Sequence, residues 1–214
     1  MTVPLPFGTS CPNCGAAIRF RWAQAVQTTC DFCKSVLVRR DLALEKVGQQ
    51  ADFPVTGSPV QLGMEGRWRE HTFVVVGRLS YAWSRGRWNE WYCRLSNGEG
   101  AWLSDAQLEY AMTQEIAPGR PLPDPASLKV GDTVETPLKR YVVTSLTQAA
   151  YIGTEGELPF TTDSRDLCWF ADLTSGDEVF ATLDGSELPA RLFVGEYVSW
   201  REMSPTGMRE FAGW

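Results

Sequence analysis

The chain has 214 residues, of which 43% are hydrophobic and 21% charged, and its formal net charge is −6 at pH 7. This balance is typical of a folded globular protein and excludes a disordered chain. There is no run of about 18 apolar residues, so no membrane span is expected, and the first residues lack the basic and apolar regions of a signal peptide. We therefore expect a cytoplasmic protein whose six cysteines are reduced or metal-bound.

The most specific motif lies in the first forty residues. Two C-x2-C pairs, Cys11 with Cys14 and Cys30 with Cys33, are separated by fifteen residues. Two residues between thiolates suit a tight turn that directs both sulfurs at one ion, and four thiolates form a closed tetrahedral shell suited to Zn²⁺. The spacing predicts a zinc ribbon over residues 1–40. Because four protein ligands leave no position for a reacting water, we expect the zinc to be structural.

The predicted ribbon also carries a candidate binding surface. Residues 1–40 hold five basic side chains against one acidic side chain, whereas residues 118–214 hold eight against fifteen. Only the ribbon should therefore attract phosphate groups. Its Arg19, Arg21 and Trp22 are the expected contacts to nucleic acid or to an acidic protein surface.

Composition and turn residues divide the rest of the chain into five segments. They are a linker (41–58) that begins with one helical turn, a first β half (59–117), a proline-rich connection (118–127), a second β half (128–202) and a tail (203–214). Within the first half, "SDAQLEYAM" (104–112) predicts a short helix with Ser104 or Asp105 as its N-cap.

The two β halves resemble each other in sequence. Gly63 and Phe73 are ten residues apart, as are Gly131 and Tyr141, and "WYCRLSNGEGAWLSD" aligns with "WFADLTSGDEVFATL". The alternation of apolar and polar residues indicates strands, and the repeated pattern predicts an internal duplication. The expected fold is mainly β, with a zinc ribbon followed by a duplicated, small, SH3-like β-barrel domain. The pattern leaves open whether the halves form one barrel or two.

The aromatic stretch "GRWNEWYCRLSNGEGAWL" (86–103) is either a binding platform or part of a core. Trp91 and Trp102 have aromatic counterparts in the second half, so we expect both to pack in a core. Trp88, Asn89 and Glu90 have no such counterparts and form the candidate binding surface of the β domain. The structural alternative is a strand junction at which Trp88 caps the sheet.

No catalytic set can be assembled from the sequence. His71 is the only histidine, and the chain contains no phosphate-binding loop or zinc-protease motif. We therefore assign no catalytic residue and do not expect an enzyme.

The blocks "GMEGRW", "FVVVGRL", "WNEWY", "GAWLSD", "VGDTV", "EGELP" and "VGEYVSW" give the chain a resemblance to a bacterial family. It is similar to an uncharacterised domain-of-unknown-function family that often carries an N-terminal four-cysteine zinc ribbon and is often encoded near phage-shock-protein-A-like proteins. The resemblance implies a cytoplasmic accessory role in envelope stress or a related defence system, with such a protein as a partner. It implies no catalytic residues.

Three functions are consistent with these patterns. The leading hypothesis is a non-enzymatic, zinc-binding adaptor that binds protein partners. The second is nucleic-acid binding through the basic ribbon, and the third is a small-molecule or enzymatic site around Asn89 and Glu90. The partner's identity and the oligomeric state remain open.

Overall fold

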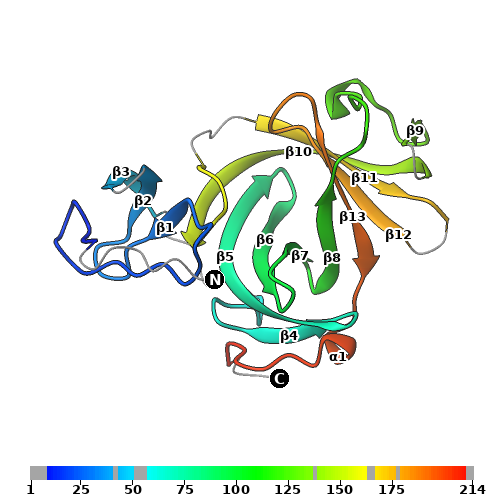
Figure 1. The fold of residues 1–214 in the computed structure, drawn as a ribbon. Coiled ribbons are helices and arrows are strands. Elements are labelled where there is room, and N and C mark those ends of the chain that lie inside the picture. Colours follow the sequence, from blue (N-terminus) through cyan, green and yellow to red (C-terminus); the bar gives the residue numbers. More distant parts are fainter. Residues whose placement is uncertain are drawn as a thin grey trace.

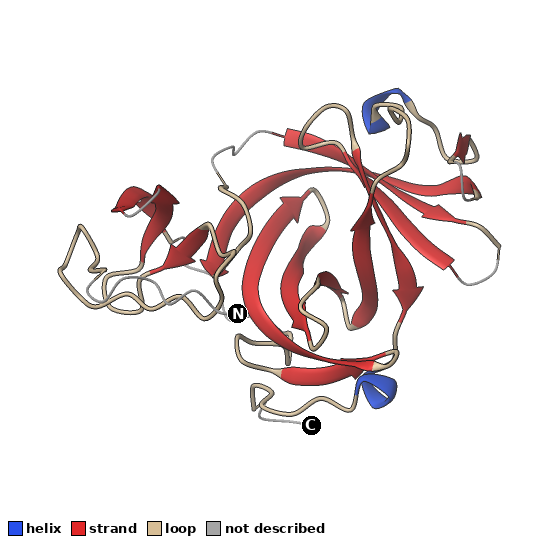
Figure 2. Ribbon diagram, in the orientation of Figure 1, coloured by secondary structure: helices blue, strands red, loops and turns tan. Residues whose placement is uncertain are grey.

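The computed structural model describes residues 9–40, 43–50, 57–136, 139–162, 167–176 and 179–210. This part of the chain is mainly β and contains a three-stranded sheet and a ten-stranded sheet. Figure 1 shows the small N-terminal sheet beside a barrel, and Figure 2 shows how little helix accompanies them. The helical segments are α1 (Trp200–Met203) and the 3-10 turn η1 (Pro125–Ser127). Among the residues described, no helix has the length and apolar character needed to cross a membrane.

The three-stranded sheet carries the four clustered cysteines and is called the cysteine module below (residues 9–50). Its antiparallel strands are β1 (Gln27–Thr29), β2 (Ser35–Arg40) and β3 (Ala43–Gln49). The helical turn predicted at the start of the linker is wrong, because residues 43–49 form β3 and pair with the outer edge of β2. This pairing satisfies the hydrogen-bonding groups of β2 that β1 does not reach.

The ten-stranded sheet closes on itself. Its strands are β4 (Glu65–Trp68), β5 (His71–Trp83), β6 (Gly86–Leu95), β7 (Gly100–Ala106), β8 (Glu109–Ile116), β9 (Thr133–Glu135), β10 (Arg140–Gly156), β11 (Leu167–Thr174), β12 (Val179–Asp184) and β13 (Arg191–Tyr197). The order is β4-β5-β6-β7-β8-β13-β12-β11-β10-β9, and an additional pairing of β5 with β10 closes the eight strands between β4 and β9 into a barrel. All of these pairings are antiparallel.

The predicted β-barrel is confirmed, but the two halves form one eight-stranded barrel, which is larger than an SH3-like domain. Each half supplies a four-stranded meander, β5 to β8 or β10 to β13, with two free edges. Those edges pair with each other, β5 with β10 and β8 with β13, so that one barrel contains both halves. Closure removes the exposed edges that two separate meanders would leave.

Equivalent positions of the two halves occupy equivalent places in the fold. Each meander follows a short strand, β4 or β9, and each has its own apolar core on the outer face of the barrel wall. The aligned residues Phe73 and Tyr141 both lie in these cores. Trp91 is 0% exposed in the first core, which confirms its predicted packing role. A common origin of the halves remains a prediction.

The helix predicted for residues 104–112 is wrong. The segment is a hairpin in which β7 and β8 are joined by a two-residue turn, with positive φ angles at Gln107 (54°) and Leu108 (70°). Buried Leu103 and Met112 pair across the hairpin and belong to the first core. Sheet pairing and core burial thus outweigh the weak helical preference of the segment.

Part of the predicted tail packs against the barrel. Met203, at the end of α1, is fully buried in the first core, and Thr206 forms a β-bridge with Glu65. Residues 211–214 lie outside the described part of the chain. The described portion of the tail thus covers the outer core next to β4, where Figure 1 places α1.

The cysteine module is docked on the barrel by hydrogen bonds and apolar contacts. The backbone N–H of Leu158 donates to Gln27 O at 3.0 Å, and Gln27 N–H donates back at 3.1 Å. The backbone N–H of Arg21 donates to the two carboxylate oxygens of Glu157 at 2.8 and 3.0 Å. Trp22 lies against Tyr92 of the barrel, with ring centroids 5.7 Å apart. The module thus packs against the end of β10 and the neighbouring part of the barrel.

Candidate functional site

The four cysteine sulfurs of the module lie close enough to share one ion. All four Sγ atoms are within 4.8 Å of one another. Cys11 Sγ and Cys33 Sγ are 3.6 Å apart, and Cys14 Sγ and Cys30 Sγ are 3.8 Å apart. A tetrahedral zinc site with Zn–S bonds of 2.3 Å would have sulfur–sulfur edges of about 3.8 Å. The cysteine set therefore fits a tetrahedral metal ion.

Two similar turns bring the cysteine pairs together. The backbone N–H of Gly15 donates to Cys11 O at 2.8 Å, and that of Lys34 donates to Cys30 O at 3.0 Å. Gly15 and Lys34 both have left-handed backbone conformations, with φ of 77° and 57°. Each turn therefore ends in the same way, just after a C-x2-C pair. This repeated geometry explains why two short motifs can form one four-sulfur site.

Only part of the predicted binding surface of the ribbon is exposed in the structure. Arg19 and Arg21 are exposed. Trp22 is only 8% exposed, because it packs against Tyr92 and under the Arg94 guanidinium, which lies 4.5 Å from its ring centroid. The indole therefore contributes to the module–barrel contact, and its faces are not available to stack on a base.

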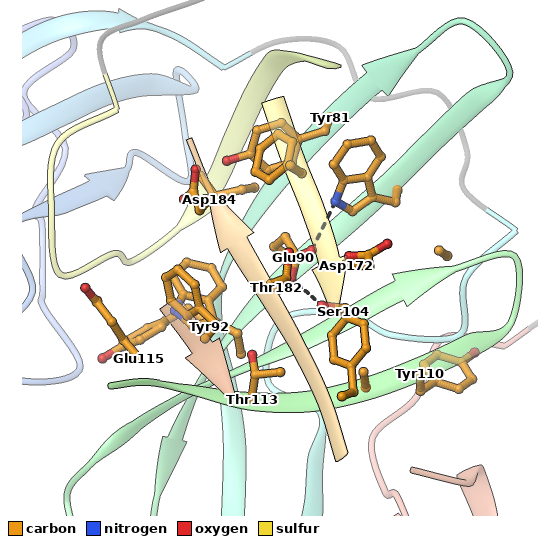
Figure 3. Close-up of a pocket in the computed structure, with 18 of the residues that line it drawn as sticks. Tyr81, Glu90, Tyr92, Ser104, Tyr110, Thr113, Glu115, Asp172, Thr182 and Asp184 are labelled. Atoms are coloured by element: carbon orange, nitrogen blue, oxygen red, sulfur yellow. Dashed lines mark hydrogen bonds between the residues drawn. The ribbon is translucent and has the colours of Figure 1, made fainter. Parts of the chain in front are cut away.

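A cavity of about 700 Å³ occupies the barrel (Figure 3). Its walls contain residues from all eight barrel strands. It lies on the face of each strand opposite the outer cores. Eleven aromatic side chains line it, and Trp102 is among them. Trp102 is buried, as predicted, but it faces the cavity. Exposed lining residues at the β7–β8 turn, including Gln107 and Glu109, mark where the cavity meets solvent.

Strand alternation separates the three neighbouring candidates Trp88, Asn89 and Glu90. They lie inside β6 and not at a junction, and only Trp88 and Glu90 line the cavity. Asn89 is buried on the other side of the strand, where its Oδ1 accepts hydrogen bonds from the Arg78 guanidinium at 2.9 and 2.6 Å. Asn89 therefore belongs to a buried structural network.

Glu90 is the most perturbed carboxyl group in the cavity. Trp88 Nε1 donates to Glu90 Oε1 at 3.0 Å, and Ser104 Oγ donates to Oε2 at 2.7 Å (Figure 3). Burial in the barrel raises the pKa of Glu90 to about 8, although both hydrogen bonds lower it. The charges of Asp172 and Asp184 raise it further. Glu90 thus faces other carboxyl groups across the same space.

Asp172 and Asp184 come from the opposite half of the barrel. Burial raises the pKa of Asp172 to about 6, and a hydrogen bond with Thr182 opposes that rise. Asp184 instead forms an ion pair with Arg191, whose Nη2 lies 2.8 Å from Asp184 Oδ2. Within the described residues, neither Glu90 nor Asp172 forms a salt bridge.

Three aromatic rings form one continuous surface next to Glu90. Tyr81 stacks on Trp88 with ring centroids 5.1 Å apart and an interplanar angle of 19°. Phe170 meets both rings edge-on, at 5.1 Å from Tyr81 and 5.5 Å from Trp88. The cavity wall therefore combines carboxyl groups with aromatic surface, which suits the binding of a small molecule that has both a polar and an apolar part.

Sequence reasoning singled out Trp88 and Glu90 but missed Tyr81, Asp172 and Thr182. These residues lie on the strand faces opposite the core positions, to which the sequence analysis assigned no role. The available signal was the presence of aromatic residues on both faces of the same strands, since a solvent-facing strand face is usually polar.

The family comparison matches the barrel. A family model described as a domain of unknown function (DUF4178) matches residues 61–200, which include every barrel strand but not the cysteine module. No curated protein and no solved structure matches the chain. With most of its length covered by that match, the chain belongs to the DUF4178 family.

Proposed function

We propose that this protein binds a small molecule inside its β-barrel. The observation that carries the proposal is the cavity of about 700 Å³ with Glu90, Asp172 and three packed aromatic rings on its wall. Ligand pockets commonly have volumes of about 300–1,000 Å³, with mainly apolar walls and a few convergent polar groups. Among the three functions inferred from the sequence, a small-molecule site around Glu90 is the one that this geometry favours.

The cysteine module supports the barrel in this proposal, with Zn²⁺ as its ion. Four thiolates at tetrahedral spacing suit zinc and leave no open coordination position. Zinc would stabilise a module that is too small to build a large apolar core. The module in turn holds Trp22 against Tyr92, which lines the cavity.

The test uses the neutral fluorescent probe N-phenyl-1-naphthylamine and the full chain. We expect saturable binding with enhanced fluorescence and a 1:1 stoichiometry. Thr147 lines the cavity from β10, so Thr147→Trp should fill the space and weaken binding. Val142→Trp is the matched control, because Val142 is exposed on the same strand and does not line the cavity. Unsaturable binding, or equal binding by both variants, would contradict the proposal.

The predicted adaptor role is a second candidate, favoured by apolar exposure on the cysteine module. Phe32, in the turn between Cys30 and Cys33, is 78% exposed, and Val47 of β3 is 41% exposed. A protein-binding surface commonly contains exposed apolar side chains that lie together. Phe32→Ser should then abolish capture of a specific partner from nuclease-treated native extract while metal content is unchanged. Unchanged capture would exclude Phe32 from such a surface. The accessory role in envelope stress remains an expectation from the family resemblance.

A further inference from the structure

We infer that the ligand of the barrel is an organic cation, an amine or quaternary ammonium attached to an apolar body, which places its charge between Glu90 and Asp172. This inference rests on the proposed function and specifies the class of ligand. Three features of the cavity support it: the acidic charge of the wall, the ion pairing or solvent exposure of its two arginines, and the aromatic surface beside the two carboxyl groups.

The wall of the cavity is acidic. Its lining residues include six acidic side chains and two arginines. The acidic residues are Glu90, Glu99, Glu109, Glu115, Asp172 and Asp184, and the arginines are Arg87 and Arg191. A site lined by one predominant sign of charge concentrates ligands of the opposite sign.

The arginines do not provide an anion site. Arg191 is paired with Asp184 at 2.8 Å and lies 5.7 Å from the ring centroids of Phe160 and Phe193, so its charge is matched even though its buried Nε has no hydrogen-bond partner among the described residues. Arg87 is exposed near the β5–β6 turn. An anionic ligand would meet the acidic wall with no unmatched cation in the interior. Anions are therefore disfavoured.

Glu90 and Asp172 are the interior acids that lack a cationic partner among the described residues. The charge of Asp172 acts on Glu90, so the two groups face a common space, as Figure 3 also shows. Enclosing carboxyl groups away from water is unfavourable unless an opposite charge or hydrogen-bond donors compensate. An ammonium group supplies both, and its charge favours the carboxylate form of Glu90, which is mainly protonated at pH 7 in the empty cavity. A purely apolar ligand supplies neither.

The aromatic rings beside Glu90 complete the site for a cation with an apolar body. Tyr81, Trp88 and Phe170 all line the cavity and contact one another. Aromatic faces attract cations through their quadrupoles and also accept aliphatic or aromatic groups. Ser104 and Thr182 line the same space and add hydroxyl oxygens that an ammonium N–H can donate to.

The experiment compares two probes that differ in charge but have nearly the same shape. 4-Phenylbutylamine, which is cationic at pH 7, and neutral 4-phenylbutan-1-ol each compete with N-phenyl-1-naphthylamine for the full chain. We expect the amine to bind about tenfold more tightly than the alcohol, the gain typical of a charge-assisted hydrogen bond over a neutral one. Glu90→Gln/Asp172→Asn should remove this preference and retain alcohol binding.

Glu70→Gln is the matched control, because it removes the same charge from an exposed residue that does not line the cavity. It should keep most of the preference for the amine. Equal binding of amine and alcohol to the natural protein would overturn the inference but leave the proposed function intact, and so would an unchanged preference in the double variant. If the naphthylamine itself does not bind, the proposed function fails together with the inference.

Discussion

Glu90 shows that the chemistry of one residue depends on which face of a strand it occupies. Its neighbours Asn89 and Trp91 point into the outer core, while Glu90 faces the cavity with Ser104 and Trp88 as hydrogen-bond donors. The raised pKa follows from this enclosure, because a carboxylate loses its hydration there and gains only two donors.

The pH dependence of stability should report this enclosure. The pKa of Glu90 rises from an ordinary value of 4.5 to about 8 on folding, so its contribution to stability is fully present below about pH 4.5 and is lost as the pH rises to about 8. In the Glu90→Gln variant this position carries no ionisable group, so the variant should not lose stability in this way as the pH rises. The melting temperature of the variant minus that of the natural protein should therefore become larger from pH 5 to pH 8. Calorimetry at each pH measures this difference.

Glu109→Gln serves as the comparison for that melting experiment, since Glu109 is exposed. Its melting curve should follow that of the natural protein at each pH. Parallel curves for Glu90→Gln and the natural protein would show that Glu90 is hydrated in the folded state.

At the scale of elements, the seam between β5 and β10 determines whether two meanders become one barrel. Gly77 of β5 lies at an irregularity in strand pairing, and a β-carbon there would collide with the carbonyl oxygen of Glu157. The close approach lets β10 continue into the Glu157–Leu158 segment, which binds the cysteine module. The absence of a side chain at Gly77 thus permits both the closure of the barrel and the docking of the cysteine module.

Gly77→Ala should therefore lower the free energy of unfolding by about 1–3 kcal/mol, the usual range for a steric clash at a packed position. Urea denaturation followed by circular dichroism measures this loss. Gly86→Ala provides the control, because the nearest atom to an added β-carbon there is 3.7 Å away. Equal stabilities of the two variants would show that the seam can relax around a methyl group.

The cysteine module should depend on its metal more than the barrel does. Cys30→Ser removes one of four sulfurs, and we expect it to lose bound zinc and to unfold the module while most β-sheet signal remains. Mass spectrometry under native conditions measures the metal, and circular dichroism measures the sheet. Cys168→Ser, outside the cysteine cluster, should retain the metal. Collapse of the whole β-sheet signal would instead show that the barrel cannot fold without the module.

At the scale of the whole molecule, the barrel has apolar cores on the outside of its wall and a cavity inside. The outer cores are covered by β4, β9 and the segments next to them. A further cluster on the inner side, which includes Tyr92 and Trp102, fills only part of the interior. This arrangement allows a closed barrel to be stable and still provide space for a ligand.

Ligand binding should accordingly stabilise the entire fold. At a probe concentration 100 times its Kd, binding adds about 2.7 kcal/mol to the free energy of unfolding, which corresponds to a rise in Tm of about 5–10 °C for a chain of this size. Differential scanning calorimetry with N-phenyl-1-naphthylamine measures the shift. Thr147→Trp should show a smaller shift than Val142→Trp. A shift of the same size in both would indicate binding outside the barrel.

The sequence by itself determined the local features of this protein. The C-x2-C spacing predicted the four-cysteine cluster, because its ligands are set by two short turns, and alternation predicted strands and the buried position of Trp91. Only the tertiary structure decided that the halves share one barrel, that residues 104–112 form a hairpin and that Trp88 and Glu90 share a cavity with Tyr81 and Asp172. Period-two alternation shows that a strand has two faces, but it does not show whether the second face meets solvent or an enclosed space. That difference arises only when β5 and β10, about seventy residues apart along the chain, pair and close the sheet.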